Sequence, residues 1–358
     1  MNETFNPEMM VLARESEGLT QTELATRISA LQGSTVTQGT VSKIESGLAK
    51  PTDDQIDLMA KVLRFPRAFF FQAAPVFGYG SSCYYHRKRQ DISVSTMRRA
   101  LADINILRIQ LSKLLRGAEI DTSLRFHPMD VAEYESPEKI ARLLRGLWRL
   151  PPGPVQNLIH TIESGGGVVF KFPFGTRKID AISQWLPGLP PIMFVNSEIP
   201  GDRLRYTVAH ELGHLIMHQT PSADIESEAN RFAAEFMMPE KDIGPHLRGL
   251  SIQKLAVMKP VWKMSMAAML KRSYDLGKVT VSMYRKLNTQ ISKYGFKTVE
   301  PVSIAPEEPT VLRDLINVHL REHGYSRTEL ADLLLAGEAR FRKFYLPEEA
   351  SNQLRLVG

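Results

Sequence analysis

Short amphipathic segments fill residues 1–72, where apolar residues recur at helical spacing between polar turns. Thr20 stands directly before one of these segments and Glu23 follows three residues later, an arrangement typical of a capping box. The pattern therefore predicts a helix that begins after Thr20. Its inward face consists of apolar residues spaced by one and three positions, namely Leu24, Ala25 and Ile28.

A second helix is predicted after a polar turn at 29–36, with Val41 and Ile44 inward and Gly47 at its end. The outward side chains of this helix are polar. Two helices packed across each other, with the polar first turn of the second one exposed, are how a helix-turn-helix reads the major groove. The candidate DNA-binding residues of this stretch are Gln21, Thr37, Gln38, Thr40 and Lys43.

The sequences LTQTELA and TVSKIESG, followed by KPTDDQIDLMAKVL, resemble the Cro/repressor-like (Xre) helix-turn-helix family over roughly residues 5–72. The resemblance implies binding to double-stranded operator DNA. Two features depart from the family. The turn at 29–36 is about six residues longer than usual, and residues 1–72 carry seven Lys/Arg against nine Asp/Glu. Because phosphate neutralisation supplies most nonspecific affinity, we expect this module alone to bind DNA weakly.

Residues 73–83 are rich in Gly, Ser and Pro and predict a linker. The following segment, 84–116, carries eight Lys/Arg and two Asp/Glu, so its charge of +6 equals that of the whole chain. Apolar residues at helical spacing predict a helix over about 94–115. The concentrated charge indicates a polyanionic or acidic partner, with Arg87 and Lys88 as candidate phosphate contacts. A solvated basic helix face is the alternative.

Three apolar runs bounded by Gly, Pro and Ser predict strands at 167–172, 180–185 and 192–196, and helical patterns follow from residue 202. The predicted fold class is mostly α with a small β-sheet (α+β). The chain divides into a helix-turn-helix domain at 1–72, a linker and basic helix at 73–118, a mixed domain at 119–296, and a tail of unknown role at 297–358. The tail begins with Pro and Glu and ends in two amphipathic helices.

The sequence HELGH at 210–214 lies within a helical pattern. His210 and His214, four residues apart, project from one helix face about 6 Å apart and can bind one Zn²⁺ together. Glu211 lies beside them and can accept a proton from water. A helix with two structural histidines is the alternative. Gly213 lowers helix propensity, so its presence indicates close packing at that point.

A zinc peptidase site needs a third protein ligand. With a single cysteine, Cys83, the chain must supply a histidine or a carboxylate. His218 is separated from His210 by about 12 Å of helix rise, too far to share one ion. Glu228 is favoured, because it would be buried beside the apolar face of a second helix and would need a cation there. The less favoured choices, which are more readily solvated, are Glu226 and Glu235.

The stretches VNSEIPGDRLRYTVAHELGHLIMH and ESEANRFAAEFMMP resemble the ImmA/IrrE family of zinc metallopeptidases over about residues 160–240. The resemblance implies a gluzincin-like fold in which two histidines and a glutamate bind zinc and another glutamate is the base. It carries these roles onto His210, His214 and Glu228, with Glu211 as base. It also implies an association with helix-turn-helix repressors, which some members cut. Tyr206, one turn before His210, is a candidate oxyanion donor, although core packing is favoured.

These features predict a DNA-binding transcriptional regulator with a zinc-dependent endopeptidase domain that cleaves itself or a partner repressor to relieve repression. Two alternatives stay open: the zinc domain is a non-catalytic sensor or scaffold, or the helix-turn-helix binds only protein, as in an antitoxin-like partner. An apolar run of about 18 residues and a secretory signal are both missing, and cysteine is scarce. We therefore expect a cytoplasmic protein without a membrane partner, in which a homodimer is allowed and the tail is a candidate cover for the site.

Overall fold

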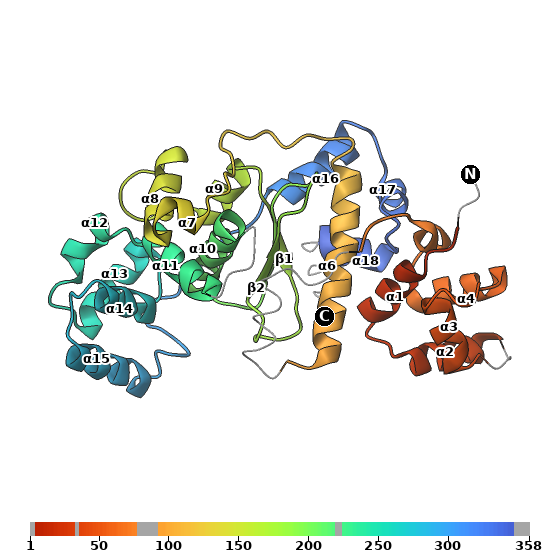
Figure 1. The fold of residues 1–358 in the computed structure, drawn as a ribbon, viewed down its shortest axis with the longest axis horizontal. Coiled ribbons are helices and arrows are strands. Elements are labelled where there is room, and N and C mark those ends of the chain that lie inside the picture. The colour runs from red at the N-terminus through yellow and green to blue at the C-terminus, as the bar shows by residue number, and fades with distance from the viewer. Residues whose placement is uncertain (1–3, 33–35, 77–91, 219–223, 347–358) are drawn as a thin grey trace, which may run out of the picture. The chain divides into compact units, whose positions relative to one another are not determined.

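The computed structural model describes residues 4–32, 36–76, 92–218 and 224–346 (Figure 1). The chain forms two compact units. The first combines the helix-turn-helix region and residues 89–120 with Leu312–Gly358, and the second contains Asp121–Val311. Residues 312–346, predicted as part of a separate tail, thus lie in the first unit, whereas 297–311 lie in the second. Among the described helices, none is both long and apolar enough to cross a membrane.

The N-terminal part of the first unit is helical, as predicted. Its elements are α1 (Pro7–Ser16), α2 (Gln21–Gln32), α3 (Gln38–Glu45), α4 (Asp53–Leu63) and the 3₁₀ helix η1 (Arg67–Phe71). The predicted capping box is confirmed, because the Glu23 amide donates to the Thr20 hydroxyl and the Glu23 carboxylate accepts from the Thr20 amide. The inward residues of both predicted helices are buried, and Gly47, which follows the C-cap residue Ser46 of α3, has a φ of +73°.

The predicted turn at 29–36 is partly wrong, because α2 extends through Gln32. The sequence Ser-Ala-Leu-Gln at 29–32 contains no glycine or proline, and three of its residues have good or fair helix propensity. Part of the apparent insertion is therefore an extra turn of α2. The connection between the two helices is correspondingly shorter than the sequence suggested.

Helix α6 (Val94–Leu114) confirms the predicted helix, but it is a core element of the first unit. Arg108 is 2% exposed and donates to the Pro75 carbonyl, and burial lowers its pKa to about 10. Arg99 donates to the Ser16 carbonyl and Lys113 to the Leu333 carbonyl. The alternative of a solvated basic helix face is therefore wrong for Arg108, which is also withdrawn from any polyanionic partner, whereas Arg99 is exposed and Lys113 is half-buried.

Three helices, not the predicted two, form the C-terminal part of the first unit: α16 (Val311–Arg321), α17 (Arg327–Leu333) and α18 (Glu338–Tyr345). They satisfy polar groups that α6 buries. Gln110 donates to the Leu334 carbonyl and contacts the Tyr345 hydroxyl, while the buried Asp103 pairs with Arg340. Buried polar groups need such partners, so this segment is built into the core of the first unit.

The second unit holds a three-stranded sheet of β1 (Val168–Phe172), β2 (Ala181–Gln184) and β3 (Ile192–Asn196). All three predicted strands are thus confirmed. The strand order is β1-β3-β2, with β1 parallel and β2 antiparallel to β3. The helices of this unit are α7 (Val131–Tyr134), α8 (Pro137–Leu147), α9 (Leu158–Ser164), α10 (Gly201–Met217), α11 (Ile225–Met237), α12 (Glu240–Ile243), α13 (Ile252–Trp262), α14 (Met266–Asp275) and α15 (Val281–Lys293), with the 3₁₀ helix η2 (Gly244–Leu247).

Helix α10 lies between the sheet and α11 and contacts both (Figure 1). The close packing predicted at Gly213 is confirmed. A Cβ atom at this position would lie 3.0 Å from Phe232 Cδ1 and 3.4 Å from Ala229 Cα on α11. The missing side chain therefore lets the two helices approach each other at the level of the HELGH sequence.

Residues 299–311 form a strap over the first half of α10 and its surroundings. The strap supplies carboxylates to buried cations: Glu300 pairs with Lys259, and Glu307 pairs with Arg205. Lys259 and Arg205 are 2% and 1% exposed. A buried cation is destabilising without a partner. The strap is therefore part of the second unit, beyond the boundary at 296 that was predicted for this domain.

Candidate functional site

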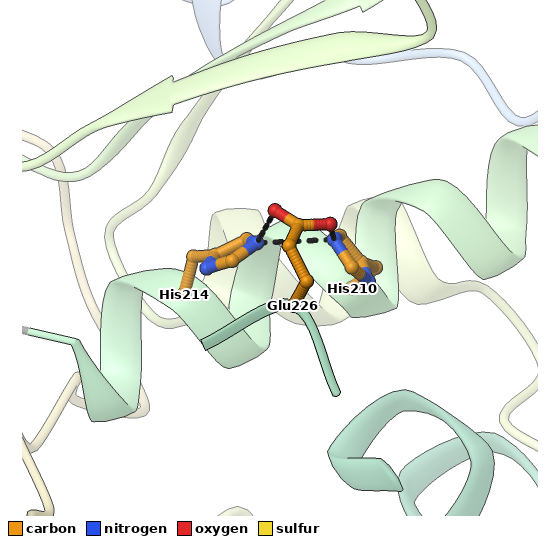
Figure 2. Close-up of side chains that lie close together, drawn as sticks. All are labelled: His210, His214 and Glu226. Carbon is orange, nitrogen blue, oxygen red and sulfur yellow. Dashed lines mark hydrogen bonds and ion pairs between the residues drawn. The ribbon is translucent and has the colours of Figure 1, made fainter. Parts of the chain in front are cut away.

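Two histidines of α10 and one glutamate of α11 converge in the second unit (Figure 2). One ligand atom from each of His210, His214 and Glu226 lies within 4.8 Å of the others. The His210 and His214 Nε2 atoms are 3.0 Å apart, and the Glu226 carboxylate oxygens lie 3.6 and 3.4 Å from them. The His214 side chain is 4% exposed, whereas those of His210 and Glu226 are 14% and 22% exposed. The cluster therefore borders solvent on one side.

The structure brings Glu226 into this cluster in place of Glu228, which the sequence analysis favoured. The reason is the rotation of α11. Ala229 lies against Gly213 of α10, and Glu226, three residues earlier, shares that face. Glu228 is about 100° away from Ala229 on the helix. Its carboxylate contacts His218 at 3.0 Å.

Glu211, the predicted base, is 1% exposed and lies next to His210 on α10. Ser183 of β2 donates a hydrogen bond of 2.5 Å to its carboxylate. The sheet packs on the side of α10 that faces away from α11. The hydrogen bond from the sheet thus fixes the direction of the Glu211 side chain. Sequence reasoning did not find Ser183, because 28 residues separate it from Glu211 and no local pattern marks it.

His218, set aside as a ligand of the same ion as His210, is part of the surroundings of the cluster. Its Nδ1 atom is 2.9 Å from His214 Nδ1, and its Nε2 atom is 3.0 Å from the Glu228 carboxylate. Burial and the neighbouring His214 lower the pKa of His218, although Glu228 acts in the opposite direction. The spacing of four residues from His214 was the available signal, since residues four apart on a helix are neighbours.

Glu235 and Tyr206 lie outside the cluster. Glu235, the other less favoured ligand, is buried and pairs with Arg272 and Arg142. The Tyr206 hydroxyl donates to the Asn230 carbonyl at 3.2 Å, and burial raises its pKa to about 12. Its contact with the α11 backbone agrees with the packing role that the sequence analysis preferred over an oxyanion role.

Polar side chains at the starts of α2 and α3 are linked to each other. The Gln38 amide donates to Gln21 at 2.7 Å, and the Gln21 amide donates to Glu45 at 2.7 Å. Arg14 forms two hydrogen bonds with the same Glu45 carboxylate, at 2.5 and 3.0 Å. Gln38 is exposed to solvent, and its hydrogen bond with Gln21 orients its side-chain amide. Sequence reasoning missed the supporting roles of Arg14 and Glu45.

The other candidate DNA-binding residues divide into three groups. Thr37 caps α3, its hydroxyl accepting from the Thr40 amide, and the two threonine hydroxyls lie 3.0 Å apart. Lys43 is exposed in the last turn of α3. Arg87 and Lys88 lie outside the described residues. The structure thus groups Gln21, Gln38, Thr37 and Thr40 near the first turn of α3.

Comparison with known proteins finds one matching family model within each unit. A family model described as an IrrE N-terminal-like domain matches residues 162–274, which include β1 to β3, α10 and α11. A model described as helix-turn-helix matches residues 12–70. No curated protein matches the chain at a significant level. The chain therefore joins an Xre-type helix-turn-helix DNA-binding domain to a metallopeptidase-like domain of the ImmA/IrrE type.

Proposed function

We propose that the protein is a transcriptional regulator whose second unit is a zinc-dependent endopeptidase that cleaves the chain itself or a partner repressor. The observation that carries this proposal is the convergence of His210, His214 and Glu226, with Glu211 next to His210 in α10. The family assignments support the pairing of a DNA-binding domain with a peptidase-like domain. We assign Glu226, not Glu228, as the third ligand.

The cluster fits the donor set and spacing of a zinc site. Two imidazoles and one carboxylate leave one position of a tetrahedral ion for water or substrate. Donor atoms about 2.0–2.1 Å from a tetrahedral ion lie about 3.3 Å from one another. The two Nε2 atoms, 3.0 Å apart, and the pair of His214 Nε2 with one Glu226 carboxylate oxygen, 3.4 Å apart, lie close to this value, and the second carboxylate oxygen is 3.6 Å from His210 Nε2. Zinc bound here supplies Lewis-acid polarisation of a peptide carbonyl and activation of water.

Glu211 is the group that moves the proton in the proposed peptide hydrolysis. Its carboxylate accepts a proton from water as the water oxygen adds to the carbonyl carbon, and the same proton is delivered to the leaving amine nitrogen as the C–N bond breaks. Ser183 holds this carboxylate through its hydrogen bond. A side chain fixed from a strand needs little reorganisation during the reaction.

The first unit provides the DNA contacts in this proposal. Gln38, Thr40 and Lys43 present polar groups from α3, and Gln21 supports Gln38. Cleavage of a DNA-bound chain or its partner then ends repression. The competing function is a regulator whose zinc domain only senses or scaffolds; it would bind zinc and DNA equally well without needing Glu211.

Comparison of Glu211→Gln with wild type tests the proposal. As a matched control we choose Glu133→Gln, an exposed glutamate of the same unit. Each zinc-loaded full-length protein is incubated alone and with repressors encoded beside its gene, and products are followed by intact mass. We expect all three proteins to contain zinc and to shift the upstream DNA, and only Glu211→Gln to lose cleavage. Equal release of wild type and Glu211→Gln from DNA under inducing conditions would instead establish the non-catalytic sensor.

A further inference from the structure

The imidazole of His214 has a defined partner on the side that faces away from the cluster. Its Nε2 atom belongs to the cluster, and its Nδ1 atom lies 2.9 Å from His218 Nδ1. His218 Nε2 in turn lies 3.0 Å from the Glu228 carboxylate. Glu228, His218 and His214 therefore form a continuous polar chain that ends at a proposed zinc ligand.

We propose that Glu228 and His218 are positioning residues that hold His214 in the tautomer with its proton on Nδ1, so that Nε2 presents a lone pair to zinc. The inference rests on the proposed function only in naming zinc as the ion. The tautomer itself is a property of the metal-free chain. It also gives Glu228 a role other than that of a ligand.

The protons follow from the donor and acceptor capacity of each group. An ionised carboxylate only accepts, so the proton in the His218–Glu228 contact belongs to His218 Nε2. A neutral imidazole with its proton on Nε2 has an acceptor at Nδ1. The contact between the two Nδ1 atoms therefore needs the proton of His214. Because His214 then carries its proton on Nδ1, its Nε2 atom is an acceptor and is available as a metal ligand.

The alternative arrangement is less favourable at this position. With His218 protonated on Nε2, a proton on His214 Nε2 would set two Nδ1 lone pairs against each other at 2.9 Å. The side chains of His214 and His218 are 4% and 2% exposed, so bulk water has little access to relieve that conflict. Glu228, with its side chain 19% exposed, lies at the outer end of the chain.

The backbone supports the same arrangement. His218 is the C-cap residue of α10, and its amide donates to the His214 carbonyl at 3.0 Å. His214 and His218 are thus fixed relative to each other by both their main chains and their side chains. Partners of this kind orient metal-binding histidines and usually change metal affinity about 10–100-fold when removed.

Metal-free full-length protein labelled with ¹⁵N-histidine tests the tautomer directly. Long-range proton–nitrogen correlations distinguish a protonated from an unprotonated ring nitrogen. Comparison with His214→Ala assigns the His214 signals. We expect the Nδ1–H form for His214 and the Nε2–H form for His218 in wild type. In Glu228→Leu, we expect the His214 signals to move to averaged values of the two tautomers.

Zinc affinity is measured on the same proteins by competition with a chromophoric chelator. We expect Glu228→Leu and His218→Phe each to weaken zinc binding about 10–100-fold. Glu228→Gln keeps an acceptor for His218 and should retain most of the affinity. Ser227→Ala, an exposed neighbour on α11, is the matched control and should bind as wild type. The double variant Glu228→Leu/His218→Phe should be no weaker than His218→Phe, because the two residues act in series.

The outcomes separate the two proposals. If wild type binds no zinc but His214 is in the Nδ1–H form and loses it in Glu228→Leu, the proposed metal site fails and the positioning role stands. If wild type binds zinc while His214 is in the Nε2–H form, or Glu228→Leu binds as tightly as wild type, the positioning role is overturned and the metal site stands. Should Glu228→Leu fail to fold, the wild-type tautomer and the zinc affinity of His218→Phe measured against that of Ser227→Ala still decide.

Discussion

The two candidate functional surfaces use the same construction in different surroundings. On the DNA-reading side, Gln38 bonds to Gln21, which bonds to Glu45. In the second unit, His214 contacts His218, which contacts Glu228. In both cases one intermediate side chain connects a functional group to a glutamate, and the glutamate fixes the direction of the hydrogen bonds because it only accepts.

The surroundings of these two chains are reversed. Gln38 is exposed at the functional end, and the chain runs inward to Glu45, which pairs with the buried Arg14. His214 is buried at the functional end, and its chain runs outward to the partly exposed Glu228. A group that reads DNA must project into solvent, whereas a metal ligand works best with water excluded. Within the series from Gln38 to Glu45, substitutions should therefore affect folding mostly at the Glu45 end. Within the series from His214 to Glu228, substitutions at every position should affect metal binding.

The largest expected contrast lies between two glutamates in the first turn of α11, Glu226 and Glu228. Glu226→Gln removes the carboxylate of the cluster and leaves two ligands, so we expect zinc affinity to fall by at least about 100-fold. Glu228→Gln should retain most of the affinity, because it keeps an acceptor for His218. Elemental analysis after dialysis against a weak chelator measures both. Loss of zinc in Glu228→Gln with retention in Glu226→Gln would restore the ligand that the sequence favoured.

The next effect is on stability at the inner end of the DNA-side chain. Arg14 and Glu45 have side chains that are 9% and 6% exposed, so Glu45→Ala leaves a buried cation without its carboxylate. We expect the free energy of unfolding of the first unit to fall by about 3 kcal/mol. All three tryptophans, Trp148, Trp185 and Trp262, lie in the second unit. Circular dichroism should therefore show that the first unit unfolds more easily than in wild type, whereas tryptophan fluorescence, which reports on the second unit, should be unchanged. Coincident shifts of both signals would contradict this assignment.

Local signals explain how much of this architecture could be predicted from the sequence. The capping box at Thr20 and Glu23, the three strands and the glycine at 213 each depend on residues close in sequence or on a single steric requirement. The pair His210 and His214 is a property of one helix. These features were predicted because neighbouring residues determine them.

The features that were missed depend on how separate elements are rotated and paired. The choice between Glu226 and Glu228 depends on which face of α11 meets α10, and both faces contain glutamate. Arg108 contributes to the net charge of the sequence, yet its guanidinium is buried against the Pro75 carbonyl, 33 residues away. Glu300 and Glu307 of the 299–311 strap likewise pair with cations about 40 and 100 residues earlier. No periodic pattern within one segment carries this information.

The outer end of the DNA-side chain should affect specificity more than stability. Gln38→Ala removes an exposed amide that can pair with a base edge, and loss of such a contact costs about 1–3 kcal/mol of discrimination. We expect selection from random DNA to show relaxed preference at one position, with an unchanged melting temperature. Lys43→Ala, on the same helix, is the comparison, since loss of a phosphate contact should weaken all sequences similarly and reduce the salt slope by about one. An unchanged sequence preference in Gln38→Ala would remove α3 from the reading surface.

The smallest expected effect is that of a substitution at Gln21. It tests whether Gln21 orients Gln38 in the way that His218 orients His214. Gln21→Ala leaves Gln38 in place but removes the partner that orients its amide, a neutral hydrogen bond worth about 1 kcal/mol. Discrimination at the position read by Gln38 should therefore fall by about that amount, and Thr22→Ala, an exposed neighbour on α2, should leave it unchanged. If Gln21 acts through Gln38, the double variant should discriminate no worse than Gln38→Ala alone. Additive losses would show that Gln21 contacts DNA independently, and the parallel between the two chains would then hold only for the metal side.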